Sequence, residues 1–221
     1  MNDKIIHVYL MPGMAASPKI FEYIKLPENQ FELHRLEWTL PLKNESVSGY
    51  ALRMTTTFIK HDNVVLLGVS FGGIVVQEMA KHITVRKLII VSSIKTKFEL
   101  PRKLSFLRYI RFYNLVPLSW VNKIEVIKKY TFSSRIYKKM EQYDRYLSVK
   151  DSGYLRWAFK EVLCWNQEVC LPDIVHIHGD SDTIFPIKNI QNCMVVEKGT
   201  HAMIITKYQW FNENLPAIIL E

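Results

Sequence analysis

Residues 64–73 read VVLLGVSFGG, an apolar run that leads into a serine with a glycine two residues away on each side. The apolar half is typical of a strand that is covered on both faces in a parallel sheet, and residues 72–82 have a helical pattern. A strand–turn–helix context distinguishes a nucleophile turn from a chance Gly-x-Ser-x-Gly match. The stretch therefore predicts that Ser70 is exposed on a sharp turn, near the backbone N–H groups that open the next helix.

Strands and helices alternate on both sides of this stretch. Strand-like apolar runs occur at 5–10, 31–38, 64–69, 87–92, 173–178 and 192–196. Helical patterns occur at 18–25, 47–60, 72–82 and 202–220. Pro18 is suited to open the first helix and Ser46 to cap the second. The alternation predicts an α/β fold with a doubly wound, mainly parallel sheet of about six strands.

The alternation stops at residues 97–168, a segment that is rich in aromatic and basic residues. It has helical spacing, is interrupted by Pro101 and Pro117, and contains no strand-like run of comparable strength. We expect a helical insert that lies over the carboxyl edge of the sheet and is joined to it at both ends. The chain of 221 residues is then a single domain, 1–221, with this insert inside it.

Composition sets limits on the compartment. No apolar run approaches the roughly 18 residues of a membrane span, and the run at 5–10 is too short for the core of a signal peptide. The three cysteines, Cys164, Cys170 and Cys193, are odd in number and lack metal-ligand spacing. These features predict a cytoplasmic protein with no stable membrane insertion.

The net charge of +8 is concentrated in the insert. Residues 95–161 carry 16 Lys and Arg against 6 Asp and Glu, whereas the rest of the chain carries 13 against 15. Solvated faces of amphipathic helices account for this charge, although a cationic insert also favours anionic substrates or a membrane surface. No recognition motif accompanies the basic residues, so nucleic-acid binding is not expected.

A serine hydroxyl becomes a nucleophile only when a base removes its proton and an acid orients that base. Residues 174–186 read IVHIHGDSDTIFP, a strand that runs into a turn with two acids. Asp182 lies further out on the turn and is favoured as the orienting acid. Asp180 follows Gly179 and is suited to tie down the turn. A purely turn-forming role for both acids remains the alternative.

The base is expected near the end of the chain. Residues 193–201 read CMVVEKGTH, a strand and a glycine loop that deliver His201 just before the last helix. A cap or surface histidine would look similar, but the order Ser70, Asp182, His201 favours a base. The other histidines are His7, His34, His61, His82, His176 and His178. None forms a ligand pair backed by a third ligand, so we expect no metal and no cofactor.

The first strand-like run ends in residues 10–17, LMPGMAAS. A glycine turn here would aim the Met14 N–H at the same edge of the sheet as the Phe71 N–H. Two such donors would form an oxyanion hole. An ordinary strand-to-helix loop is the alternative.

Taken together, these four motifs resemble those of the α/β-hydrolase family, in family order and over about 150 of the 221 residues. The resemblance implies a Ser70–His201–Asp182 triad, oxyanion donors at Met14 and Phe71, and a cap formed by residues 97–168. The chain has Pro12-Gly13 where the family commonly has His-Gly. It also begins directly at the equivalent of the family's third strand, so we expect the fold without its N-terminal hairpin.

The expected reaction is hydrolysis of a carboxylic ester or thioester through an acyl-enzyme on Ser70. Aromatic residues in the insert suggest an apolar acyl or aryl group: Phe106, Tyr109, Phe112, Trp120, Trp157, Phe159 and Trp165. The same fold and triad also serve C–C bond hydrolysis, lyase and acyl-transfer chemistry. A non-catalytic small-molecule binding module is a third alternative.

Overall fold

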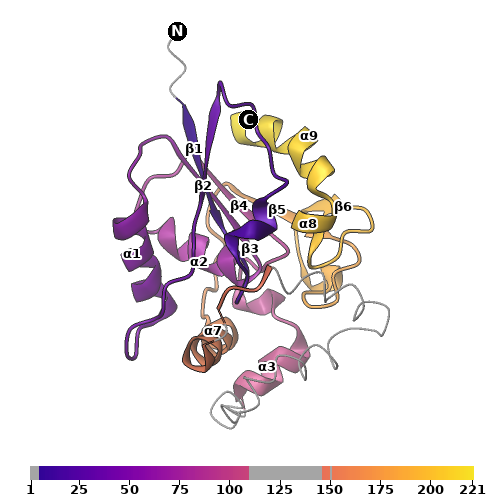
Figure 1. The fold of residues 1–221 in the computed structure, drawn as a ribbon. Coiled ribbons are helices and arrows are strands. Elements are labelled where there is room, and N and C mark those ends of the chain that lie inside the picture. The colour runs from indigo at the N-terminus through magenta and orange to yellow at the C-terminus, as the bar shows by residue number, and fades with distance from the viewer. Residues whose placement is uncertain (1–4, 110–145, 150) are drawn as a thin grey trace.

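The structure, a computed structural model, describes residues 5–109, 146–149 and 151–221. Its centre is one six-stranded sheet in the order β2-β1-β3-β4-β5-β6, in which every strand pair is parallel (Figure 1). The strands are β1 (Ile6–Met11), β2 (Phe31–Arg35), β3 (Val64–Val69), β4 (Lys87–Val91), β5 (Ile174–Gly179) and β6 (Met194–Val196). The prediction of a doubly wound parallel sheet of about six strands is confirmed.

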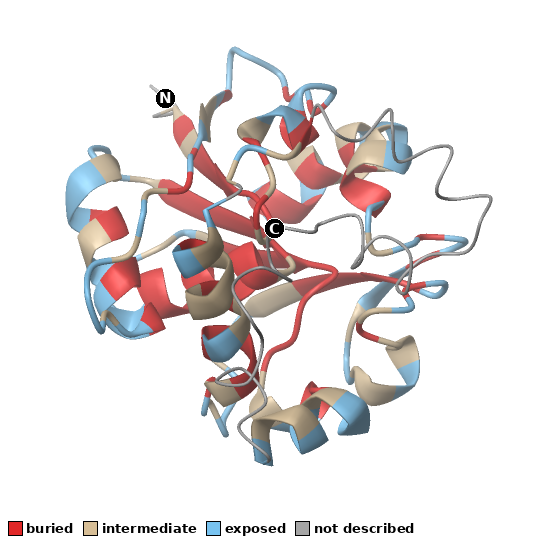
Figure 2. Ribbon diagram, turned by 60° about the horizontal axis from the view of Figure 1, so that its bottom comes forward, coloured by how far each residue is buried: buried red, intermediate tan, exposed pale blue. Residues whose placement is uncertain are grey.

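Helices cover both faces of this sheet. The described helices are α1 (Val47–Phe58), α2 (Phe71–Met79), α3 (Arg102–Tyr109), α7 (Ser152–Cys164), α8 (Met203–Thr206) and α9 (Tyr208–Leu220). Short 3₁₀ helices are η1 (Pro18–Phe21), η2 (Lys97–Glu99) and η5 (Ile187–Asn189). Helices α1, α2 and α7 share one hydrophobic core with the sheet, while η1, α8 and α9 share a second core on the opposite face. In Figure 2 the strands form the buried centre and the outer sides of the helices are exposed.

Two expected helices differ from the structure. Residues 18–25 do not form an α-helix, because their backbone hydrogen bonds span three residues, as in Ile20 N–H to Ser17 O and Glu22 N–H to Lys19 O. The last helix is divided at Lys207, whose φ of −120° and ψ of 26° lie outside the helical region. The expected cap of α1 is confirmed, since Ser46 Oγ accepts the Gly49 N–H at 3.2 Å.

The strand order determines where a site can form. The chain runs from β1 outward to β2 and then returns to place β3 on the other side of β1. The connections that leave β1 and β3 at their carboxyl ends therefore run toward opposite edges of the sheet, and such a switch point is where ligands bind in open α/β sheets. Gly13 follows β1 and Ser70 follows β3, so both lie at this point of the sheet.

The turn between β3 and α2 is unusually tight. Ser70 has a φ of 54° and a ψ of −121°, a backbone conformation that residues other than glycine rarely adopt. A Cβ at Gly68 would collide with the Gly72 carbonyl, and a Cβ at Gly72 would collide with the backbone of Met11 and Pro12. The two glycines are thus required by close backbone approach.

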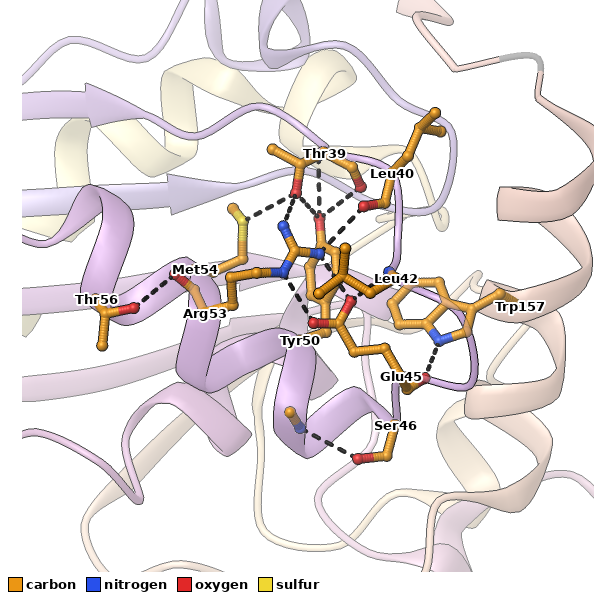
Figure 3. Close-up of polar contacts among 11 residues, drawn as sticks. Thr39, Leu40, Leu42, Glu45, Ser46, Tyr50, Arg53, Met54, Thr56 and Trp157 are labelled. Carbon is orange, nitrogen blue, oxygen red and sulfur yellow. Dashed lines mark hydrogen bonds and ion pairs between the residues drawn. The ribbon is translucent and has the colours of Figure 1, made fainter.

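Helix α7 is tied to the segment that precedes α1 (Figure 3). The Trp157 indole N–H donates to the Glu45 carbonyl at 2.6 Å. The Arg53 guanidinium donates twice to the Glu45 carboxylate, at 2.8 and 2.7 Å, and so holds the segment that carries Glu45. Residues 110–145 and 150, the middle of the expected insert, lie outside the described residues. No helix in the described part of the chain is long and apolar enough to cross a bilayer.

We expect Glu45→Gln to lower the free energy of unfolding by about 1 kcal/mol at pH 7, because it removes the charge from a partly screened bidentate pair. The hydrogen bond from Arg53 holds the pKa of Glu45 below its usual value. A lowered carboxyl pKa adds stability above the unfolded-state pKa, about 4.3, and this stability is lost as pH falls through the folded-state pKa. The difference should therefore shrink below about pH 4. Urea unfolding at several pH values measures it, with the exposed Glu28→Gln as control.

A second prediction compares Ser70→Gly with Ser70→Ala. Both variants lose the hydroxyl, so their difference reports the backbone alone. Since glycine tolerates a positive φ and alanine does not, the glycine variant should be more stable by about 1 kcal/mol, despite its larger unfolded-state entropy. Equal unfolding midpoints in urea would show that the turn relaxes without strain.

Candidate active site

Three side chains from separate parts of the chain meet beside the turn after β3. The Ser70 Oγ lies 2.9 Å from Nε2 of His201, and Nδ1 of His201 lies 2.8 Å from Oδ2 of Asp182. Asp182 follows β5 and His201 follows β6, so both side chains reach the carboxyl edge of the sheet at which Ser70 lies. The structure thus brings together the three residues that the sequence singled out.

Ser70 occupies the position before the first turn of α2, where a serine hydroxyl ordinarily accepts a backbone N–H of its own helix. No such hydrogen bond is formed here. The positive φ turns the side chain away from the helix axis and toward His201. The Ser70 hydroxyl is consequently available to the imidazole. It accepts none of the first N–H groups of α2.

Asp182 is held in one orientation by the backbone of its own turn. Its Oδ1 accepts the N–H groups of Ile184 and Phe185 at 2.8 and 2.9 Å, which leaves Oδ2 for His201. The side chain is fully buried. Burial by itself raises the pKa of Asp182, but the His201 hydrogen bond and charge, with the Phe185 N–H, outweigh it and lower the pKa. The carboxylate is therefore ionised at neutral pH.

Asp180, the alternative acid, lies elsewhere. It is exposed, and its Oδ1 accepts the Ser181 hydroxyl at 2.9 Å. The histidine contact belongs to Asp182 alone of the two. Asp180 thus has the turn-bracing geometry that its place after Gly179 suggested.

Two buried histidines support the acid from β5. His178 Nε2 donates to the Phe185 carbonyl at 2.7 Å and lies 3.6 Å from Asp182 Oδ2, and its Nδ1 faces His176 Nε2 at 3.0 Å. Burial lowers the pKa of both imidazoles, that of His176 to about 2. Both rings are therefore neutral, and they pack beneath Asp182 without adding a positive charge.

The turn after β1 lies against Ser70. A Cβ added to Gly13 would be 3.4 Å from the Ser70 Cβ, so the two turns touch. Within the described part of the chain, neither the Met14 N–H nor the Phe71 N–H has a hydrogen-bond acceptor. Unused N–H groups next to a reactive hydroxyl are what an oxyanion hole requires.

Sequence reasoning missed the two side chains that brace this turn. The Trp38 indole N–H donates to the Gly13 carbonyl at 2.8 Å, and the Tyr154 hydroxyl accepts the Ala15 N–H at 3.2 Å. Trp38 follows β2 and Tyr154 lies in α7, so no local pattern connects either residue with the turn. Together they brace the Pro12-Gly13 turn.

The aromatic residues expected in a cap differ in position. Trp157 packs edge-on against Phe71, with ring centroids 5.6 Å apart. Trp165 is buried, and its indole N–H donates to Glu78 of α2 at 2.8 Å, so it belongs to the core. Phe106 and Tyr109 are exposed. Phe159 is partly buried and packs against the core that α2 shares with the sheet. Phe112 and Trp120 lie outside the described residues.

Histidines that the sequence did not connect come together elsewhere. Within the described ranges, His7, His34 and His61 each offer a ring nitrogen, and these nitrogens lie within 4.8 Å of one another. Their positions, 27 residues apart or more, gave no ligand spacing, which is why the sequence predicted no metal. The group lies away from Ser70, near the start of β1.

The geometry suits one kind of chemistry. A buried carboxylate orients an imidazole, and the other nitrogen of that imidazole is within hydrogen-bond reach of a hydroxyl. The exposed fraction of the His201 side chain is 24%, so a small molecule can approach it, whereas Asp182 is sealed from solvent. Such an arrangement can remove a proton from Ser70 and return it to a leaving group.

No protein-family model matches the chain, and no curated protein resembles it in sequence. Solved structures resemble it in fold. A lipase-esterase related protein from Clostridium acetobutylicum superposes with a TM-score of 0.61 at 18% identity, covering 98% of this chain and 96% of that one. A bromoperoxidase from Bacillus anthracis gives 0.65 at 17% identity, with 100% and 94% covered. YbtT, a type II thioesterase from the yersiniabactin NRPS/PKS biosynthetic pathway, gives 0.64 at 16% identity, with 100% and 95% covered.

These three structures are described by different activities, and each is less than 20% identical to this chain. What they share with it along nearly its whole length is the arrangement of strands and helices. That arrangement, with the parallel sheet order described above, shows that this chain has the α/β-hydrolase fold.

Proposed function

We propose that this protein is a serine hydrolase that cleaves a carboxylic ester or thioester through an acyl-enzyme on Ser70. The observation that carries the proposal is the continuous hydrogen-bonded path from Ser70 Oγ through His201 to the buried Asp182. A binding module would have no need of an ionised, fully buried acid aligned with a strained serine, since both features cost stability.

In the proposed reaction Ser70 Oγ attacks the carbonyl carbon while His201 Nε2 takes the hydroxyl proton. Asp182 keeps the imidazole in the tautomer with Nδ1 protonated and stabilises the imidazolium that forms. The tetrahedral oxyanion is stabilised by the N–H groups of Met14 and Phe71. His201 then gives the proton to the leaving alcohol or thiol, and water hydrolyses the acyl-enzyme by the same steps.

The substrate is proposed to be a small molecule with an apolar acyl or aryl group. Phe71 stacks on Trp38, with ring centroids 5.3 Å apart, and packs edge-on with Trp157, so aromatic rings from three parts of the chain gather beside the turn that carries Ser70. Residues 97–168 are proposed as the cap that completes the pocket, as the family resemblance implies. Helix α7, at the end of that segment, contacts the turn after β1 through Tyr154 and Phe71 of α2 through Trp157.

The nucleophile is tested by labelling with a fluorophosphonate probe. We expect one label per chain on wild type, none on Ser70→Ala, and full labelling on the matched control Ser181→Ala, an exposed serine of the acid turn. Hydrolysis of p-nitrophenyl esters and acyl thioesters of graded chain length should be lost in Ser70→Ala as well. A folded wild-type sample that neither labels nor hydrolyses any of these substrates would refute the proposal.

The acid is tested by the matched pair Asp182→Asn and Asp180→Asn. Loss of the orienting carboxylate should lower kcat by about 10⁴-fold. The exposed Asp180 should tolerate the same change with less than about a twofold loss, since it lies outside the path. Thermal unfolding of each variant checks that it is folded, and similar losses in the two variants would exclude Asp182 as the specific partner of His201.

A further inference from the structure

A second cluster of chemically active side chains lies at the opposite end of the sheet. His7 lies near the start of β1, His34 lies in the edge strand β2, and His61 lies in the connection from α1 to β3. Their ring nitrogens are within 4.8 Å of one another. None of these residues takes part in the proposed hydrolysis.

The strand register explains why these side chains share one face. His7 pairs with Glu32 and Tyr9 pairs with His34, and residues paired in parallel strands point to the same side of the sheet. This is the face covered by α1 and α2, because Tyr9 packs in the same core as those helices. The connection after α1 passes over this face and brings His61 against His7, with ring centroids 3.8 Å apart.

Two of the ring nitrogens lie nearly as far apart as two nitrogen ligands of one metal ion do. His7 Nδ1 and His34 Nε2 are 3.0 Å apart. Two imidazoles bound to one tetrahedral Zn²⁺ at about 2.05 Å have their nitrogens about 3.3 Å apart, so a shift of a few tenths of an ångström suffices. The Glu32 carboxylate lies 3.4 Å from the first nitrogen and 3.7 Å from the second, within reach as a fourth ligand.

The third histidine is held by the hydroxyl of Tyr9. The Tyr9 oxygen is 2.7 Å from His61 Nδ1 and accepts the Lys60 N–H at 3.2 Å. A hydrogen bond at one ring nitrogen orients the other as a ligand, as is usual around bound metals. His61 is exposed, so an ion can reach its ring from solvent.

The kinds of ligand atom in this cluster decide which metal ion it suits. Three imidazoles and one carboxylate form a donor set suited to borderline divalent transition metals, above all Zn²⁺, and ill suited to Mg²⁺ or Ca²⁺.

We propose that His7, His34 and His61, with Glu32, form a Zn²⁺ site that joins the edge strand β2 to β1 and to the segment that precedes β3. The site has no part in the proposed hydrolysis. His7 pairs with Val64, the first residue of β3, whereas Ser70 follows the last, so the two places are separated by roughly 20 Å along the sheet. The ion would hold the amino end of the sheet together, at the end remote from α7 (Figure 1).

The test is a titration of the metal-free protein with zinc chloride, followed by calorimetry and by competition with a chromophoric chelator. We expect one Zn²⁺ per chain in wild type and in Ser70→Ala. Affinity should fall at least tenfold in His61→Ala and in His34→Ala. The matched control is His82→Ala, an exposed histidine outside the cluster, and it should bind as wild type does.

Two further measurements distinguish a specific metal site from nonspecific binding of zinc. Zinc at 100 times the wild-type dissociation constant should raise the Tm of wild type by roughly 5 °C and that of His61→Ala by about half as much or less. Cobalt substitution should give a spectrum without a thiolate charge-transfer band, because Cys164, Cys170 and Cys193 are not ligands. Equal zinc affinity in wild type and His61→Ala, no binding at micromolar zinc, or a cobalt–thiolate band would each overturn the proposal.

Discussion

The close approach of two backbone segments at the carboxyl edge of the sheet is the constraint on which the rest of this structure depends. Gly68 and Gly72 let the turn after β3 fold onto itself and onto the end of β1, where any Cβ would collide with backbone. That contact forces Ser70 to a positive φ and places it against Gly13. A local steric requirement thus sets both the direction of the hydroxyl and the position of the N–H groups beside it.

The buried charge of Asp182 is a second feature that lowers the stability of the fold, after the strained backbone of Ser70. An isolated carboxylate away from water would be strongly disfavoured, and here two backbone N–H groups and one imidazole compensate for the lost hydration. The neutral pair His176 and His178 fills the space beneath it. The strained Ser70 and the buried, charged Asp182 both contact the imidazole of His201. Such departures from the most stable arrangement concentrate at functional sites.

The two ends of the sheet are built differently. At the carboxyl end, loops from four strands supply side chains and backbone to one point, and Trp38 and Tyr154 brace the turn after β1. At the amino end, His7, Tyr9 and His34 are brought together by the register of two neighbouring strands.

The sequence by itself determined the features that depend on local order. The strand-like runs, the caps and the glycines around Ser70 follow from residue period and backbone sterics over a few residues, and so do the turns that carry Asp182 and His201. Two predictions from the sequence were wrong. A 3₁₀ helix replaces the α-helix expected at residues 18–25, and the last helix is divided at Lys207. Only the tertiary structure decided which of Asp180 and Asp182 faces His201, which residues brace the Gly13 turn, and that His7, His34 and His61 meet. These contacts depend on the strand order β2-β1-β3-β4-β5-β6 and on its register, because side chains far apart in the chain become neighbours only once the strands have paired.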